Sequence, residues 1–185
     1  MKTIIICLIV VAGLAGCASP AQVDGMTARH VDVAKATANT QTKNSISLNN
    51  VSGGGETNPL WVSKVADADF KLALEQSLKD AMLLSGTIND SKYLLEVRLI
   101  SLDQPLFGLD LKVTATAEYI LKAKSTGQII YSKTFATPFT ATFSDSAIAI
   151  QRLRIANEGA VRNNIEQVID DLISINIDKK AVAIK

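Results

Sequence analysis

Apolar and polar residues alternate in the second half of the chain, which predicts β-strands with one buried and one wetter face. The longest alternation covers 109–121. One face of this segment is apolar throughout, and the other is polar except at Ile120. Its apolar positions are Leu109, Leu111, Val113, Ala115, Ala117, Tyr119 and Leu121. Shorter strands are expected at 46–49, 93–102 and 129–135. Residues 125–128 are expected to form a hairpin turn that leads into the last strand, and Pro138 is expected to end that strand.

Two segments carry apolar residues at three- and four-residue spacing, which predicts helices with one apolar face. The first is expected to begin at an Asp67 N-cap and to close at Gly86. The second is expected from about Ser146 to Ile175, with an apolar stripe from Val161 onward. Gly159 lies inside this helix at a cost of about 1 kcal/mol relative to Ala. We therefore expect a kink or a close contact with the sheet there.

The element order strand, helix, strand, strand, strand, helix predicts an α+β fold. We expect a two-layer α/β sandwich, β-α-β-β-β-α, with a mostly antiparallel four-stranded sheet and two helices on one face. The predicted domain covers residues 45–178, and residues 179–185 form a C-terminal tail. The chain of 185 residues is long enough for one such domain with an N-terminal extension.

The N-terminus has the pattern of a signal peptide over residues 1–16. Lys2 precedes an apolar run that is too short to span a bilayer. The run ends in Leu-Ala-Gly-Cys at 14–17, which matches the lipobox of bacterial lipoproteins. This resemblance implies cleavage between Gly16 and Cys17, with fatty acyl chains such as palmitate on Cys17. The alternative is a plain secretory signal or a short membrane anchor.

The residues after Cys17 indicate where the anchor would hold the protein. Ala18 and Ser19 follow it rather than Asp. In a diderm host this implies the periplasmic face of the outer membrane. The polar stretch that continues to residue 44 shows no sustained apolar period, so residues 17–44 are interpreted as a lipidated N-terminus and tether, with local order expected around 26–33.

Composition excludes several kinds of chemistry. Lys and Arg number 19 against 18 Asp and Glu, which gives no electrostatic reason to expect a nucleic-acid partner. The two cysteines are Cys7 and Cys17, so the domain can hold no disulfide, thiolate metal site or cysteine nucleophile. The single histidine, His30, lies in the expected tether. We expect no metal, no cofactor and no catalytic residues.

Several residues remain as candidates for binding or chemistry, each with a structural alternative. Carboxylate pairs occur at 67/69 and 170/171, and we interpret both as helix features. The glycines at 53–55 lack the Lys-Ser/Thr of a phosphate loop and are interpreted as a connection. Arginines 152, 154 and 162 are expected on a solvated helix face. Possible partner-binding residues are Trp61, interpreted as core or interface anchor, and Leu106 and Phe107, which lie between two predicted strands.

The lipobox and element order together resemble small envelope lipoproteins with a two-layer α/β domain. These include the lipopolysaccharide-assembly lipoprotein, auxiliary lipoproteins of lipid-transport systems, and the N-terminal domain of TolB. Segments 51–61, 102–109 and 153–160 are similar to a group of short, uncharacterised bacterial outer-membrane lipoproteins, some labelled UDP-N-acetylglucosamine acyltransferase. Such acyltransferases use hexapeptide repeats and a catalytic histidine, and the predicted domain has neither.

The sequence therefore predicts a membrane-anchored, non-catalytic binding or accessory module. Its partner would be an envelope protein or a lipid- or lipopolysaccharide-related system. One alternative is a transferase acting on envelope glycan or lipid. The other is a self-assembling structural component of the envelope.

Overall fold

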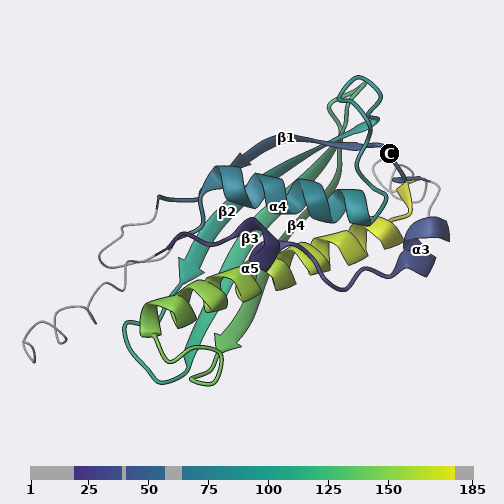
Figure 1. The fold of residues 1–185 in the computed structure, drawn as a ribbon. Helices are drawn as coiled ribbons and strands as arrows, with labels where there is room; N and C mark the ends of the chain where they lie inside the picture. Colours follow the sequence, from purple (N-terminus) through teal and green to yellow (C-terminus); the bar gives the residue numbers. More distant parts are fainter. Residues whose placement is uncertain (1–18, 39–40, 57–63, 178–185) are drawn as a thin grey trace, which may run out of the picture.

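A layer of helices covers one face of a sheet in the computed structural model, which describes residues 19–38, 41–56 and 64–177 (Figure 1). Within these residues the sheet has four strands and the helical layer has two long helices. The strands are β1 (Ile46–Ser52), β2 (Tyr93–Asp103), β3 (Leu111–Ala123) and β4 (Ile129–Ala141). The long helices are α4 (Asp67–Asp80) and α5 (Ala149–Ser174), and the short ones are α2 (Val23–Met26) and α3 (Val33–Ala38). The predicted α+β sandwich is confirmed.

The sheet is mixed, with strand order β1-β2-β3-β4. The β2–β3 and β3–β4 pairs are antiparallel, and β1 runs parallel to β2 because α4 forms the crossover between them. The alternation in β3 follows the prediction from Leu111 to Leu121, whose apolar positions are buried on the helix side. Leu109, predicted as the first buried position, precedes β3 and is exposed because it lies in the β2–β3 loop. Phe70 and Leu74 of α4 and Ile165 of α5 are fully buried in the same core.

The ends of several elements differ from the predictions. Strand β4 continues through Pro138 to Ala141, and Pro138 pairs with Thr114. This is possible because β4 is an edge strand, where a residue without an N–H is tolerated. Asp67 is the first residue of α4 rather than its N-cap, which is Ala66, because the Asp67 carboxylate accepts the N–H of Gly54 instead. Helix α4 ends at Asp80 rather than Gly86, since Met82 has a positive φ of 57° that stops the helix. Helix α5 begins at Ala149, three residues later than Ser146.

Gly159 provides the close contact between α5 and the sheet. A Cβ atom at this position would overlap the ring of Phe139 on β4. The absence of a side chain therefore lets α5 lie directly against the strand. Of the two expectations for Gly159, the structure shows the close contact.

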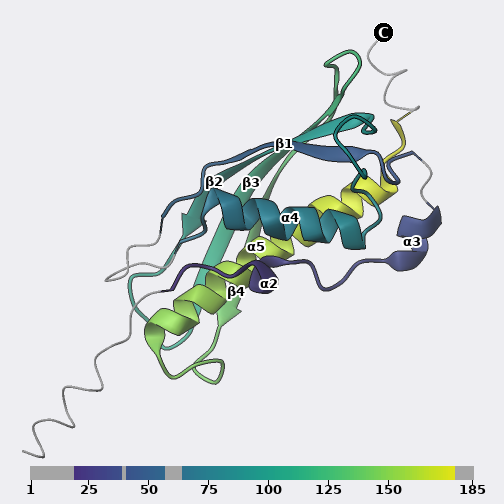
Figure 2. The ribbon, with the colours of Figure 1, turned by 45° about the horizontal axis from the view of Figure 1, so that its top comes forward.

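Residues 19–38, assigned above to the tether, are packed along the helical layer. We call this segment the N-terminal strap. Ala21, Met26, Ala28 and Ala36 are buried in it, and the backbone N–H of Ala28 donates to Ser77 Oγ of α4 over 2.9 Å. Figures 1 and 2 both show the strap running across the helices toward α3. Most of the expected tether therefore belongs to the domain.

Candidate functional site

Exposed apolar side chains gather in two loops at one end of the sheet. Leu106, Phe107 and Leu109 lie in the β2–β3 loop and are 95%, 87% and 74% exposed. Phe143 and Ile148 in the β4–α5 loop are about half exposed. The two loops are joined where the backbone N–H of Phe143 donates to an Asp110 carboxylate oxygen over 3.1 Å. We call these five residues the apolar tip, which contains two of the predicted candidates, Leu106 and Phe107.

Arg152 of α5 contacts both loops of the apolar tip. Its side chain is only 3% exposed, and Nη1 donates to the Ser146 carbonyl over 2.6 Å. Nη2 reaches the Gly108 carbonyl at 3.5 Å, and the guanidinium lies 5.3 Å from the Phe143 ring centre. The expectation of a solvated face fails for this residue, because the start of α5 is covered by both loops.

The strap begins at the same end of the molecule as the apolar tip, as both ribbon views show (Figures 1 and 2). The N–H of Ala21 donates to the Lys64 carbonyl over 3.1 Å, and the N–H of Gln22 donates to Glu158 Oε1 over 2.9 Å. The next residue toward the start of α5, Asn157, accepts a hydrogen bond from Gln104 of the β2–β3 loop. The strap and the tip are thus bound to adjacent residues of α5.

Polar side chains of α5 bind the backbone of the strap along its length. Arg162 Nη1 donates to the Gly25 carbonyl over 2.7 Å, and Glu166 Oε1 accepts from the N–H groups of Arg29 and His30. Burial raises the pKa of Glu158 above its usual value, although the Gln22 N–H favours its charged form. Arg154 lies within 3.5 Å of Glu158, so it too is engaged rather than simply solvated.

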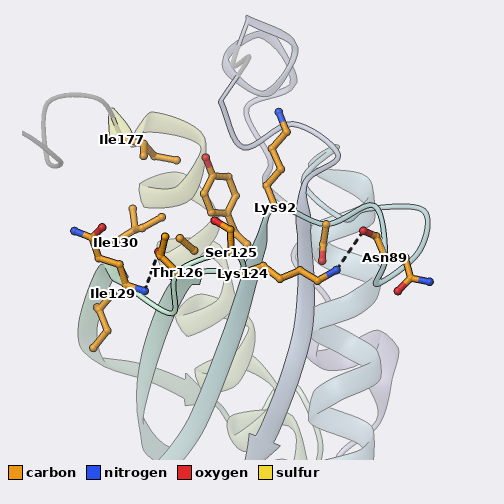
Figure 3. Close-up of a pocket in the computed structure, with 12 residues that line it drawn as sticks. Asn89, Lys92, Lys124, Ser125, Thr126, Ile129, Ile130 and Ile177 are labelled. Carbon is orange, nitrogen blue, oxygen red and sulfur yellow. Dashed lines mark hydrogen bonds between the residues drawn. The ribbon is translucent and has the colours of Figure 1, made fainter.

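An open cleft of about 800 Å³ lies at the opposite end of the sheet (Figure 3). Tyr93 at the start of β2, Ile129 and Ile130 at the start of β4, and Ile177 beyond α5 supply apolar wall. Lys124 Nζ is bound to the Asn89 carbonyl at 3.2 Å. The cleft cannot be predicted from the sequence, because its walls come from three segments whose individual patterns are those of ordinary strands and turns.

The other candidates for chemistry have structural roles. His30 is highly exposed and 3.4 Å from Glu166. Asp171 accepts hydrogen bonds from the hydroxyl of Tyr131 and from Lys133 Nζ, at 2.9 and 2.8 Å. Among the residues that the structure describes, no three His, Cys, Asp or Glu side chains are grouped to hold a metal ion. No helix in this part of the chain is long and apolar enough to cross a membrane.

The glycine loop after β1 is a tight connection to α4. The N–H of Gly54 donates to Asp67 Oδ1 over 2.6 Å, so this N–H is already bound to a carboxylate of the protein. Gly53 has a φ of 90°, and a side chain there would overlap the Leu99 carbonyl. Neighbouring backbone atoms leave no room for a side chain at Gly53 or Gly54, which explains why glycine occupies these positions. Trp61 lies outside the described residues.

Comparison with known proteins identifies the fold. No protein-family model matches the chain, and no curated protein matches it in sequence. A Xanthomonas campestris protein described under the family model DUF330 superposes with a TM-score of 0.57 at 11% identity, over 85% of this chain and 96% of the other. A minor lipoprotein from Acinetobacter baumannii superposes with a TM-score of 0.50 at 13% identity, over 71% and 91%. At these identities the likeness shows a shared fold.

Proposed function

We propose that this protein is a bacterial envelope lipoprotein whose domain is a non-catalytic binding module. The lipobox at 14–17 supports acylation of Cys17, with the outer membrane as the site of anchoring in a diderm host. Two or more acyl chains on one residue hold a protein stably to a bilayer. Of the carboxylates considered above as catalytic candidates, Asp67 accepts the Gly54 N–H, and Asp171 accepts from Tyr131 and Lys133. These structural contacts favour binding over acid–base catalysis.

The observation that carries the binding role is the position of the cleft. It lies at the end of the sheet remote from Ala21, where the packed domain begins after the anchor. A domain held at Ala21 therefore presents the cleft away from the membrane. Its apolar wall suits an acyl chain of an envelope lipid or an apolar segment of an envelope protein. Ligand pockets of several hundred Å³ with mainly apolar walls are typical of such binding.

Affinity purification of the acylated protein from gently solubilised envelopes tests this role. The variant Ile129→Asp places a charge on the cleft wall, and Leu72→Asp on α4 is a matched control because the two side chains are 49% and 52% exposed. We expect a protein or lipid to be recovered in stoichiometric amount with wild type and Leu72→Asp, and to be lost with Ile129→Asp. Recovery without any partner contradicts the binding role. Turnover of an envelope glycan or lipid by the purified protein would support the transferase alternative instead.

A further inference from the structure

We propose that the apolar tip inserts into the surface of the bilayer that holds the acyl chains of Cys17. The inference rests on the proposed lipidation of Cys17 and extends it from an anchor to a defined orientation. Leu106, Phe107 and Leu109 would form a second, non-covalent contact with the membrane. The domain would then stand on its tip, with the cleft directed into the periplasm.

The length of chain between the anchor and the domain is the first argument. Ala21 is 2% exposed and hydrogen-bonded to the Lys64 carbonyl, so the domain begins there. Four residue steps separate Cys17 from Ala21, and a fully extended chain covers at most about 14 Å over them. Acyl chains on Cys17 hold this residue at the membrane surface. The end of the domain that contains Ala21 therefore lies within about 14 Å of that surface.

The position of the apolar tip is the second argument. Gln22 is bound to Glu158, and Gln104 is bound to Asn157 over 2.8 Å, so the start of the strap and the base of the β2–β3 loop lie side by side on α5. Leu106 follows Gln104 by two residues and is 95% exposed. Figures 1 and 2 show the loops projecting at this end, with α5 extending away from it.

The space available favours a bilayer over a folded partner at the tip. A small domain is about 30 Å across, which exceeds the reach of about 14 Å between the membrane surface and Ala21. The chemistry of the loops also suits shallow insertion. The carboxylates of Asp110 and Asp145 accept backbone N–H groups of Phe143 and Thr142 at the base of the tip. Because burying these carboxylates in hydrocarbon would be costly, they are expected to stay among the lipid headgroups. Only the apolar side chains of the tip would then enter the acyl region.

Single-cysteine labelling of the acylated protein tests the proposal. After removal of the signal peptide with Cys7, the only cysteine is the acylated Cys17, so an introduced thiol is labelled alone. The variants Leu106→Cys and Phe107→Cys report on the tip, and Lys79→Cys in the exposed last turn of α4 reports on a surface that belongs neither to the tip nor to the cleft. Each carries an environment-sensitive fluorophore. The protein is reconstituted in vesicles of phosphatidylethanolamine and phosphatidylglycerol, with and without spin-labelled lipid.

We expect a blue-shifted emission, quenched by the spin-labelled lipid, at positions 106 and 107 and neither effect at 79. An aqueous signal at 106 and 107 in acylated protein overturns this inference and leaves the anchor intact. A signal that is aqueous in vesicles but shielded in native envelopes overturns it in favour of a protein partner at the tip. If mass measurement shows that Cys17 carries no acyl chain, the anchor and this inference both fail.

Discussion

The backbone N–H of Gln22 and the carboxylate of Glu158 form a hydrogen bond of 2.9 Å between residues that are 136 positions apart. The carboxylate also lies against Gly25, where a Cβ would overlap it. This contact ties the first turn of the strap to α5 close to the apolar tip. It therefore determines where the chain leaves the domain toward Cys17, and so it supports the proposed orientation of the domain at the membrane.

Replacing Glu158 tests this contact. We expect Glu158→Ala to lower the free energy of unfolding by about 1–3 kcal/mol, because the partly buried Gln22 N–H loses its acceptor. Glu158→Gln keeps an acceptor oxygen for the Gln22 N–H, so it should destabilise the protein less than Glu158→Ala does. Urea unfolding measures both. Equal losses in the two variants would show that the hydrogen bond to Gln22 contributes little.

Stability of the strap should also depend on pH through Glu158. Burial raises the pKa of this carboxyl above its usual 4.5, so the folded protein binds the proton more tightly than the unfolded chain. The stabilisation from protonation is fully present below 4.5 and is lost as the pH rises through the folded pKa. The free energy of unfolding of wild type minus that of Glu158→Gln should therefore fall between pH 4 and neutrality. A difference that rises over this range would contradict the raised pKa.

The contact of Gly159 with Phe139 predicts a rescue. Gly159→Ala would gain about 1 kcal/mol of helix propensity, yet overlap with the Phe139 ring should make the net effect destabilising by about 1–3 kcal/mol. In a Phe139→Leu background the same substitution should be much less harmful. Gly86→Ala is the control, since nothing lies within 4 Å of a Cβ there. Additive effects of Gly159→Ala and Phe139→Leu in thermal or urea unfolding would exclude the proposed overlap.

Asn164 is the central polar residue between α5 and the sheet. It accepts from the Tyr119 hydroxyl over 2.9 Å and donates to the carbonyls of Ala115 and Phe135 at 3.0 Å, all in the core. Asn164→Ala should cost on the order of 3 kcal/mol, because it creates a cavity and leaves buried polar groups without partners. The neighbouring Asn163 donates to an exposed carbonyl, so Asn163→Ala should change stability by less than about 0.5 kcal/mol. Similar losses at 163 and 164, compared by urea unfolding, would contradict this description.

Arg152 is expected to order the two loops of the apolar tip. Arg152→Gln removes the donor to Ser146 and the cation over Phe143, so amide hydrogen exchange should accelerate over 104–110 and 142–148. Exchange in the core of β3 should not change as much. The exposed Lys112→Gln is the control. Unchanged exchange in both loops would mean that Arg152 does not hold them.

The alternating and helical patterns identified most of the fold because each depends on residues close in sequence. The end of β4 could not be recognised locally, since Pro138 is tolerated only because β4 is an edge strand. The strap was missed for a related reason. Its buried residues, such as Ala21 and Ala36, are small and irregularly spaced, and its hydrogen-bond partners lie on α4 and α5.

The candidate sites were predictable to different degrees. Leu106 and Phe107 were identified because apolar residues between two predicted strands are conspicuous, but their grouping with Phe143 depends on how β4 leads into α5. The burial of Arg152 likewise follows from loops that close over the start of α5. The cleft was not recognisable at all, because it exists only where the starts of β2 and β4 meet the end of α5.

The mass of the mature protein isolated from membranes tests the lipid anchor most directly. We expect a polypeptide that begins at Cys17 and is heavier than its sequence by two or three acyl chains on that residue. We also expect the Cys17→Ser variant to stay unacylated and uncleaved. A mature chain with a free Cys17 thiol, or one cleaved at another position, would show that the protein is not a lipoprotein anchored at Cys17.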